Sequence, residues 1–356
     1  MRTKLLVILF FSLITAYSQN SSKYSNEFLN IGVDARSIGM ANAVVSSIDD
    51  VNSTYWNPAG LLNIERDEIS LMHSNYFANI ANYNFISYAR SIDNESAIGF
   101  SLIRFGVDDI LDTTQLIDSQ GNIDFNRIEL FSAADYAFLL SYAKRNNLLN
   151  LNYGINVKII RRIIGDFASS WGFGFDFGIQ HQNQNGWKFG LMARDITTTF
   201  NNWTFDEEKL NDIQSAIEGQ NQEIPEKSET TIPKLQLGIS KEFILNNEYS
   251  LLSAVDLFFL FEETNDIIST QFASITPAIG FELGYIELVY LRFGLGNFQN
   301  EIQFDSSEKL SFQPNFGIGF NMNNIEINYA FTDIGNQSVA LYSNIFSLKL
   351  NLNIIR

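Results

Sequence analysis

Residues 171–180 read Trp-Gly-Phe-Gly-Phe-Asp-Phe-Gly-Ile-Gln, and this stretch decides the fold. Its large apolar side chains occupy every second position, with glycine, aspartate or glutamine between them. A β-strand sends alternate side chains to opposite faces, so the stretch predicts a strand with one aromatic face and one small or polar face. In a soluble sandwich the second face would usually carry Lys, Glu and Thr toward water.

The same division recurs near the C-terminus. The apolar sets are Phe312, Phe316, Ile318, Phe320 and Met322, and then Phe346, Leu348, Leu350, Leu352 and Ile354. The opposing sets are Gln313, Asn315, Gly317, Gly319 and Asn321, and then Ser347, Lys349, Asn351 and Asn353. Continuous apolar faces backed by glycine and amides predict lipid outside and a polar or tightly filled lumen inside. The expected fold is all-β, a transmembrane antiparallel β-barrel.

Connections of two lengths separate the alternating segments. Short links rich in Asn and Gly fall near residues 93, 146, 183, 246, 284 and 323, and most links between them are longer. Tight periplasmic turns and larger outer loops alternate in this way in membrane barrels. The expected strands begin near residues 67, 82, 95, 133, 148, 168, 186, 232, 247, 272, 286, 311, 324 and 343. This gives about 14 strands, with both ends of the barrel on the periplasmic side.

The first eighteen residues have the pattern of a signal peptide. Arg2 and Lys4 precede an apolar run, and the small residues Ala16 and Ser18 suit cleavage after Ser18. The alternative is a short buried N-terminal helix. No other stretch has the ~18 to 20 continuous apolar residues of a membrane helix. The chain contains no cysteine, so neither a lipid-anchored N-terminus nor a disulfide is expected.

Residues 29–62 do not alternate like the rest of the chain. Small residues recur here around Gly32, Arg36 and Gly39, and they allow backbone segments to approach closely. Asn57 precedes Pro58, which disfavours helical angles and predicts a turn. We therefore expect a plug or hatch over residues 19–65, lodged in a barrel formed by residues 66–356.

The motif GVDARSIGMANA at residues 32–43, followed by DDVNSTYWNPAGL at residues 49–61, resembles the N-terminal signature of the PorV/PorQ family of outer-membrane proteins. The resemblance extends more distantly to FadL-type channels, which carry their own Asn-Pro-Ala in the N-terminal hatch. It implies a structural plug whose motif residues are Gly32, Arg36, Gly39, Met40, Asp50, Trp56, Asn57, Pro58, Ala59 and Gly60. Met40-Ala41-Asn42 departs from the commoner form, which has a small residue and a second glycine there.

Composition narrows the function classes. The formal net charge is −17, and loss of Arg2 and Lys4 with the leader brings it to about −19. Such acidity argues against nucleic acid, which needs clusters of Lys and Arg. Hydrophobic residues make up 46% of the chain, far from the composition of a disordered acidic protein. The acids concentrate in the long links, including residues 206–218, which also have the apolar spacing of a short helix that serves as a lid, a partner contact or a packed loop.

No residue pattern predicts catalysis, a cofactor or a metal. The two histidines, His73 and His181, lie in different expected strands and lack the usual zinc companions. The pairs at residues 49–50 and 108–109 are read as solvated acids, because neighbours in a strand point to opposite faces. The glycines between residues 172 and 178 belong to a strand and do not open a helix, as a nucleotide loop would. Arg161 with Arg162, and Arg104 or Arg292, are expected to reach lumen carboxylates such as Asp176.

Three functions remain open. The resemblance implies an accessory or binding component of type IX secretion or cell-surface protein attachment, with outer-membrane lipid around it and the translocon or secreted cargo as partner. The alternative is a FadL-like channel for hydrophobic small molecules, which needs an apolar lumen pocket and a side opening. The third is a structural scaffold in another outer-membrane complex. A non-lipoprotein of the bacterial outer membrane fits all three.

Overall fold

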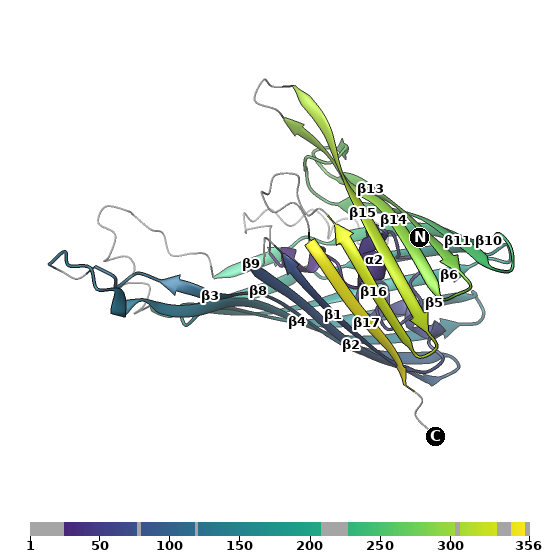
Figure 1. Cartoon of the computed structure of the whole chain (residues 1–356), viewed down its shortest axis with the longest axis horizontal. Helices are drawn as coiled ribbons and strands as arrows, with labels where there is room; N and C mark the ends of the chain where they lie inside the picture. The colour runs from purple at the N-terminus through teal and green to yellow at the C-terminus, as the bar shows by residue number, and fades with distance from the viewer. Residues whose placement is uncertain are drawn as a thin grey trace, which may run out of the picture.

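The computed structural model describes residues 25–76, 80–117, 120–207, 227–302, 307–332 and 343–352. Strands inclined in one direction run side by side around the short helix α2 (Figure 1). Fourteen of them form the closed wall: β1 (Asp67–Tyr76), β2 (Ala81–Asp93), β3 (Ser96–Asp112), β4 (Glu129–Asn146), β5 (Leu151–Ile164), β6 (Ala168–Gln182), β7 (Trp187–Arg194), β10 (Lys234–Ile244), β11 (Tyr249–Leu260), β13 (Ser274–Tyr285), β14 (Val289–Ile302), β15 (Glu308–Met322), β16 (Ile325–Thr332) and β17 (Ser343–Leu352). The expected signal peptide lies outside the described residues.

The wall closes because the first and last strands pair. In the antiparallel register of β1 and β17, Leu71 lies opposite Leu348 and His73 lies opposite Phe346. This confirms the predicted barrel of about 14 antiparallel strands, and each wall strand begins within about four residues of its predicted start. In the described part of the chain, no helix combines the length and the apolar character needed to cross a bilayer.

The aromatic faces point away from the lumen. Phe173, Phe175 and Phe316 are 58%, 45% and 50% exposed, whereas the alternating residue Asp176 is fully buried. A second sheet packed on these phenylalanines would have covered them, as in a sandwich. The outer surface of the wall is therefore the apolar one, as lipid contact requires.

The short and long connections gather at opposite ends of the barrel. The turns after β2, β4, β6, β10, β13 and β15 are short and lie at the end where β1 begins and β17 ends. At the other end β3 and β4 are 17 and 18 residues long, and their hairpin projects far beyond the wall (Figure 1). The hairpin of β14 and β15 also projects (Figure 1). A short 3-10 helix, η3 (Phe125–Arg127), lies in the link from β3 to β4.

The prediction that residues 197–231 form one long link is partly wrong. The chain continues in the wall as β8 (Thr199–Phe205) and returns as β9 (Ser228–Thr231). Both β7 and β8 pair with β6, so the two form one wall position that is interrupted between Arg194 and Thr199. Asp195 and Thr198 adopt positive φ angles of 55° and 60°, which breaks the alternation on which the prediction rested. A further short strand, β12 (Ile268–Ser269), pairs with β13.

The N-terminal segment, residues 25–66, packs on the inner face of the wall. It contains η1 (Glu27–Asn30), α2 (Ala35–Gly39), α3 (Ser53–Trp56) and η2 (Pro58–Asn63). Its apolar side chains form the core together with inward residues of the strands: Val33, Met40, Ile48, Tyr55 and Trp56 pack with Met72, Tyr83, Ile103 and Leu139. The apolar core of this protein therefore lies between the N-terminal segment and the wall.

Inward glycines let the N-terminal segment lie directly on the strands. A Cβ at Gly154 of β5 would stand 2.6 Å from the carbonyl carbon of Pro58. A Cβ at Gly280 of β13 would stand 2.7 Å from the carbonyl oxygen of Met40. The glycine-rich inner face predicted from the sequence thus has a steric reason, because backbone fills the place of side chains.

We expect Gly154→Val to destabilise the barrel by about 1–3 kcal/mol, because the added side chain must displace Pro58 or β5. Urea unfolding in detergent micelles, followed by tryptophan fluorescence, measures the change. Gly121→Asn is the control, because nothing lies within 4 Å of a Cβ there and Asn tolerates its φ of +85°. Equal unfolding midpoints for Gly154→Val and the unmodified protein would contradict this packing.

Candidate functional site

The candidate site is the contact between the N-terminal segment and the inner wall. The local backbone geometry of the segment depends on glycine at residue 32. Gly32 has a φ of +94°, and a Cβ there would stand 2.9 Å from Asn42 Oδ1 and 3.1 Å from the Trp56 ring. The Trp56 indole Nε1 donates a 3.0 Å hydrogen bond to the carbonyl of Val33. Gly32 and Trp56 are therefore brought together, and only glycine fits without strain.

Helix α2 carries Arg36 to the wall. Asp34 caps this helix by accepting a 3.3 Å hydrogen bond from the Ser37 backbone N–H, and it also accepts a 2.7 Å bond from Ser347 of β17. At the other end of α2, Gly39 lies against β15: a Cβ on it would stand 3.1 Å from the Cα of Gly317. Met40, which follows Gly39, is fully buried.

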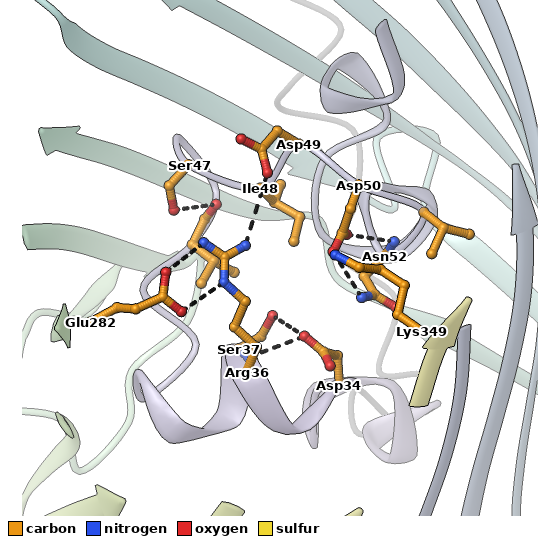
Figure 2. A network of polar contacts seen from close by, with 12 residues as sticks. Asp34, Arg36, Ser37, Ser47, Ile48, Asp49, Asp50, Asn52, Glu282 and Lys349 are labelled. Carbon is orange, nitrogen blue, oxygen red and sulfur yellow. Dashed lines mark hydrogen bonds and ion pairs between the residues drawn. The ribbon is translucent and has the colours of Figure 1, made fainter. Parts of the chain in front are cut away.

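Arg36 makes a bidentate ion pair with Glu282 of β13. Its Nε and Nη2 atoms each lie 2.9 Å from a carboxylate oxygen of Glu282 (Figure 2). The side chains of Arg36 and Glu282 are 14% and 8% exposed. A second cation, Arg292 of β14, donates from Nε to the same carboxylate at 2.5 Å. Paired and hydrogen-bonded in this way, the buried charges avoid the cost of isolated ions.

The ion pairs continue round the wall and return to the N-terminal segment. Arg292 Nη2 lies 3.6 Å from Glu326 of β16, whose other oxygen lies 2.7 Å from Lys349 Nζ of β17. Lys349 Nζ also lies 2.8 Å from Asp50 (Figure 2), so the sequence prediction of a solvated acid at Asp50 is wrong, because the side chain is buried in an ion pair. The preceding residue Asp49 lies 3.9 Å from Arg36 Nη1, which closes the circuit. We call this circuit the ion-pair ring; it consists of Asp49, Arg36, Glu282, Arg292, Glu326, Lys349 and Asp50.

Burial and neighbouring charge shift the pKa values of the segment's titratable groups. Burial and then repulsion from Asp50 raise the pKa of Asp34, although the hydrogen bond from Ser347 acts the other way. Burial alone would lower the pKa of Arg36, but attraction and hydrogen bonding to Glu282, together with attraction to Asp49 and Asp50, hold that pKa well above its ordinary value. Burial raises the pKa of the Tyr55 hydroxyl. Arg36 is therefore a permanent cation, to which the wall must supply carboxylates.

The Asn57-Pro58-Ala59-Gly60 stretch forms the turn predicted from its proline. Helix α3 ends at Trp56, and Asn57 Oδ1 accepts a 3.2 Å hydrogen bond from the Ala59 N–H at the start of η2. The Asn57 Nδ2 amide donates to the carbonyls of Ile179 in β6 and Leu191 in β7, at 3.0 Å and 3.3 Å. Gly60 is buried against the carbonyl of Ile48. This turn is thus attached to two wall strands, while its functional role stays a prediction.

Sequence reasoning missed most wall partners of the segment. Glu282, Glu326 and Lys349 were not predicted to meet Arg36 and Asp50, although each interrupts an otherwise small or amide inner face. Asp256 of β11 was also missed, and it accepts a 3.0 Å hydrogen bond from the Val45 N–H. In every case the sequence did contain a signal for a buried ion pair or hydrogen bond, namely a charged residue at an inward position of a strand.

Two predictions about arginines are wrong. Arg104 and Arg161 do not reach lumen carboxylates: they have the parity of the outward residues Leu102 and Ile159, and Arg161 lies over the Trp171 ring at 4.9 Å. Asp176 pairs instead with Lys158, at 2.8 Å. Arg162 and Arg292 do point inward, and they pair with Asp135 and Glu282 respectively.

Neither histidine lies in a metal site of the described structure. His73 lies on the outer face, 2.7 Å from Asn84 Oδ1, and His181 contacts the carbonyl of Asn150. Among the described residues no group of three or more His, Cys, Asp or Glu side chains is placed to hold a metal ion.

A cavity of about 400 Å³ lies between the N-terminal segment and strands β10 to β15. Its apolar lining includes Trp56, Phe258 and Pro277, and its charged lining includes Arg194 and Lys234. The Arg194 guanidinium lies over the Tyr55 ring at 4.5 Å. Arg194 and Lys234 flank the interruption between β7 and β8, so the cavity adjoins that part of the wall.

Comparisons with known proteins agree with this architecture. A family model described as type IX secretion system protein PorV matches residues 15–265. A comparison with curated proteins gives no match.

Solved structures share the fold at low sequence identity. The CymD monoaromatic hydrocarbon channel has a TM-score of 0.56 and 11% identity, over 91% of this chain and 98% of that chain. The toluene transporter TodX of P. putida has a TM-score of 0.56 and 12% identity, over 91% and 99%. A Pseudomonas aeruginosa FadL homologue has a TM-score of 0.50 and 11% identity, over 89% and 97%. The likeness confirms a FadL-like barrel.

We expect Glu282→Gln to lower the free energy of unfolding by about 3–5 kcal/mol, because it leaves Arg36 and Arg292 buried without their shared carboxylate. Urea titration in micelles measures this. Adding Arg36→Met to Glu282→Gln is expected to cost little more, because that pair is already broken.

Glu248→Gln is the matched control, since Glu248 is an exposed acid in the turn between β10 and β11. If Glu282→Gln changed stability no more than Glu248→Gln does, the ion-pair ring would not hold the segment.

Proposed function

The chain belongs to the PorV family of type IX secretion system proteins, and from this we propose that it is an accessory binding component of type IX secretion or cell-surface protein attachment. In this role the outer-membrane barrel is not an enzyme, and it holds a secreted cargo protein or a translocon subunit. The match carries the proposal, because it spans the N-terminal segment together with the wall from β1 to β11.

The attachment of the N-terminal segment supports a binding role over an open conduit. The ion-pair ring connects the segment to β13, β14, β16 and β17, and Asn57 connects it to β6 and β7. A segment held on both sides of the lumen is a plug that keeps the pore closed. We propose this role for residues 19–65, with Gly32, Arg36, Gly39, Asp50 and Asn57 as its structural residues.

The outer end of the barrel is the proposed contact surface. The β3–β4 hairpin that projects there carries Asp112, Asp124 and Glu129, all acidic and in or beside its outer link. An acidic, projecting surface favours partners with basic contact sites. The predicted helix at residues 206–218 lies almost entirely outside the described residues.

One observation favours the alternative, a channel for hydrophobic small molecules. The cavity of about 400 Å³ is large enough for a small apolar ligand, and aromatic side chains line part of it. The interruption between β7 and β8 lies beside it. Against this role, residues of the N-terminal segment form one side of the cavity and are bonded to the inner wall, and the likeness to hydrocarbon channels is one of fold.

Affinity purification from native outer membranes tests the proposal. We expect the tagged protein to recover type IX translocon subunits or secreted cargo, because the family match implies such partners. A tagged variant with β3 joined directly to β4 by a short turn, which lacks residues 108–131, is expected to recover less partner while still folding.

Folding of that variant is checked by its resistance to unfolding in mild detergent. Recovery of the barrel alone, with a bound apolar small molecule, would contradict the secretion role and favour the channel. If the variant without the hairpin recovered as much partner as the unmodified protein, the hairpin would not be the contact surface.

A further inference from the structure

A row of polar side chains crosses the outer face of the wall where lipid contact is expected. In register across β1, β2, β3 and β4, His73 lies opposite Asn84, Asn84 opposite Arg104, and Arg104 opposite Tyr136. All four share the outward parity of the exposed apolar residues on their strands. We call them the polar row.

Apolar rows lie directly beneath the polar row, toward the end with short turns. The first consists of Leu71, Ile86, Leu102 and Phe138, and the second of Ile69, Tyr88, Phe100 and Leu140. Above the polar row, Asn75 pairs with Asn82. Because polar groups in hydrocarbon are costly, the polar row fits a position at the hydrocarbon boundary on this side of the barrel, near the outer-leaflet headgroups.

A depression of about 710 Å³ on the outer face extends over the polar row and the apolar row beneath it. Its lining includes the apolar side chains Leu71, Ile86, Leu102, Phe346 and Leu348, and all four members of the polar row. The hollow is polar where β1 to β4 carry the polar row and apolar beneath that row and at Phe346, so it offers both a polar and an apolar surface to a lipid molecule.

The polar end is rich in hydrogen-bond donors. The Arg104 guanidinium lies over Gly106, with its Cζ 3.0 Å from the place of a Cβ, so it extends toward the outer rim. Its Nη2 donates to Asp108 at 2.8 Å and its Nε contacts the Tyr136 hydroxyl at 3.4 Å, so its contacts with the described residues leave Nη1 for a ligand. The Asn84 amide nitrogen is also available, because its Oδ1 faces His73.

Charge favours an anionic headgroup. Arg161 lies next to Tyr136 in the same register, also on the outer face, so two arginines flank that tyrosine. Asp108 is the carboxylate that contacts Arg104. In a chain with a net charge of −17, this outward concentration of arginine is an exception to the overall acidity.

We propose that the polar row, with Arg161, binds the phosphate headgroup of an outer-leaflet lipid whose acyl chains lie in the depression. Guanidinium groups bind phosphate through paired, charge-assisted hydrogen bonds. The acyl chains gain apolar contact with Leu71, Leu102 and Leu348. The site is independent of the proposed role in secretion, since it lies on the outer wall and uses no residue of the N-terminal segment.

Native mass spectrometry of the full barrel, released from detergent, tests the proposal. The probes are diphosphorylated lipid A, the same lipid without its phosphates, and inorganic phosphate. We expect the phosphorylated lipid to stay bound, and the Arg104→Gln, Arg161→Gln double variant to bind it at least ~10-fold more weakly, as the loss of charge-assisted hydrogen bonds implies. Arg90→Gln is the matched control, because Arg90 is an outward arginine at the other end of the same wall, 3.8 Å from Asp67.

Three outcomes would overturn the site: equal binding by the double variant and the Arg90→Gln control, equal binding of the dephosphorylated lipid, or retention of inorganic phosphate as strong as that of the lipid. Urea unfolding of each variant separates loss of the site from loss of the fold. The proposed site would be supported if the double variant folded correctly and lost only its binding of the phosphorylated lipid.

Discussion

The ion-pair ring between the N-terminal segment and the wall is the constraint on which the rest of the structure depends. Charges removed from water are costly unless opposite charges and hydrogen bonds surround them. Here Arg36 meets Glu282 in a bidentate pair, and Arg292, Glu326 and Lys349 connect that pair to Asp50. If the segment left, Arg36 and Asp50 would lose their wall partners Glu282 and Lys349, so removing the segment is unfavourable.

The glycine pattern of the wall follows from the same constraint. A segment held by buried ion pairs must lie close to the strands, and close approach excludes side chains at positions such as Gly154 and Gly280. The opposite faces of these strands meet lipid and carry large apolar side chains. One alternating pattern therefore encodes the membrane contact on one side and the contact with the N-terminal segment on the other.

The fold could be predicted from the sequence because alternation and turn spacing are local signals. The register between distant strands is not local: Arg36 and Glu282 are 246 positions apart, so nothing in either neighbourhood identifies the other. The interruption at Asp195 was missed because backbone with positive φ broke the alternation. The outward positions of Arg104 and Arg161 could have been predicted from the sequence, because each lies two residues after an outward apolar residue, Leu102 or Ile159.

The most direct measurement of a closed lumen is conductance across a planar lipid bilayer that contains the purified barrel. The unmodified protein is expected to give no steady open-channel current, because the N-terminal segment is held on both sides of the lumen. Arg36→Met combined with Asp50→Asn removes the ion pairs of the N-terminal segment with Glu282 and Lys349, and this double variant is expected to produce frequent openings. Steady current through the unmodified barrel, equal to that of the double variant, would contradict the account.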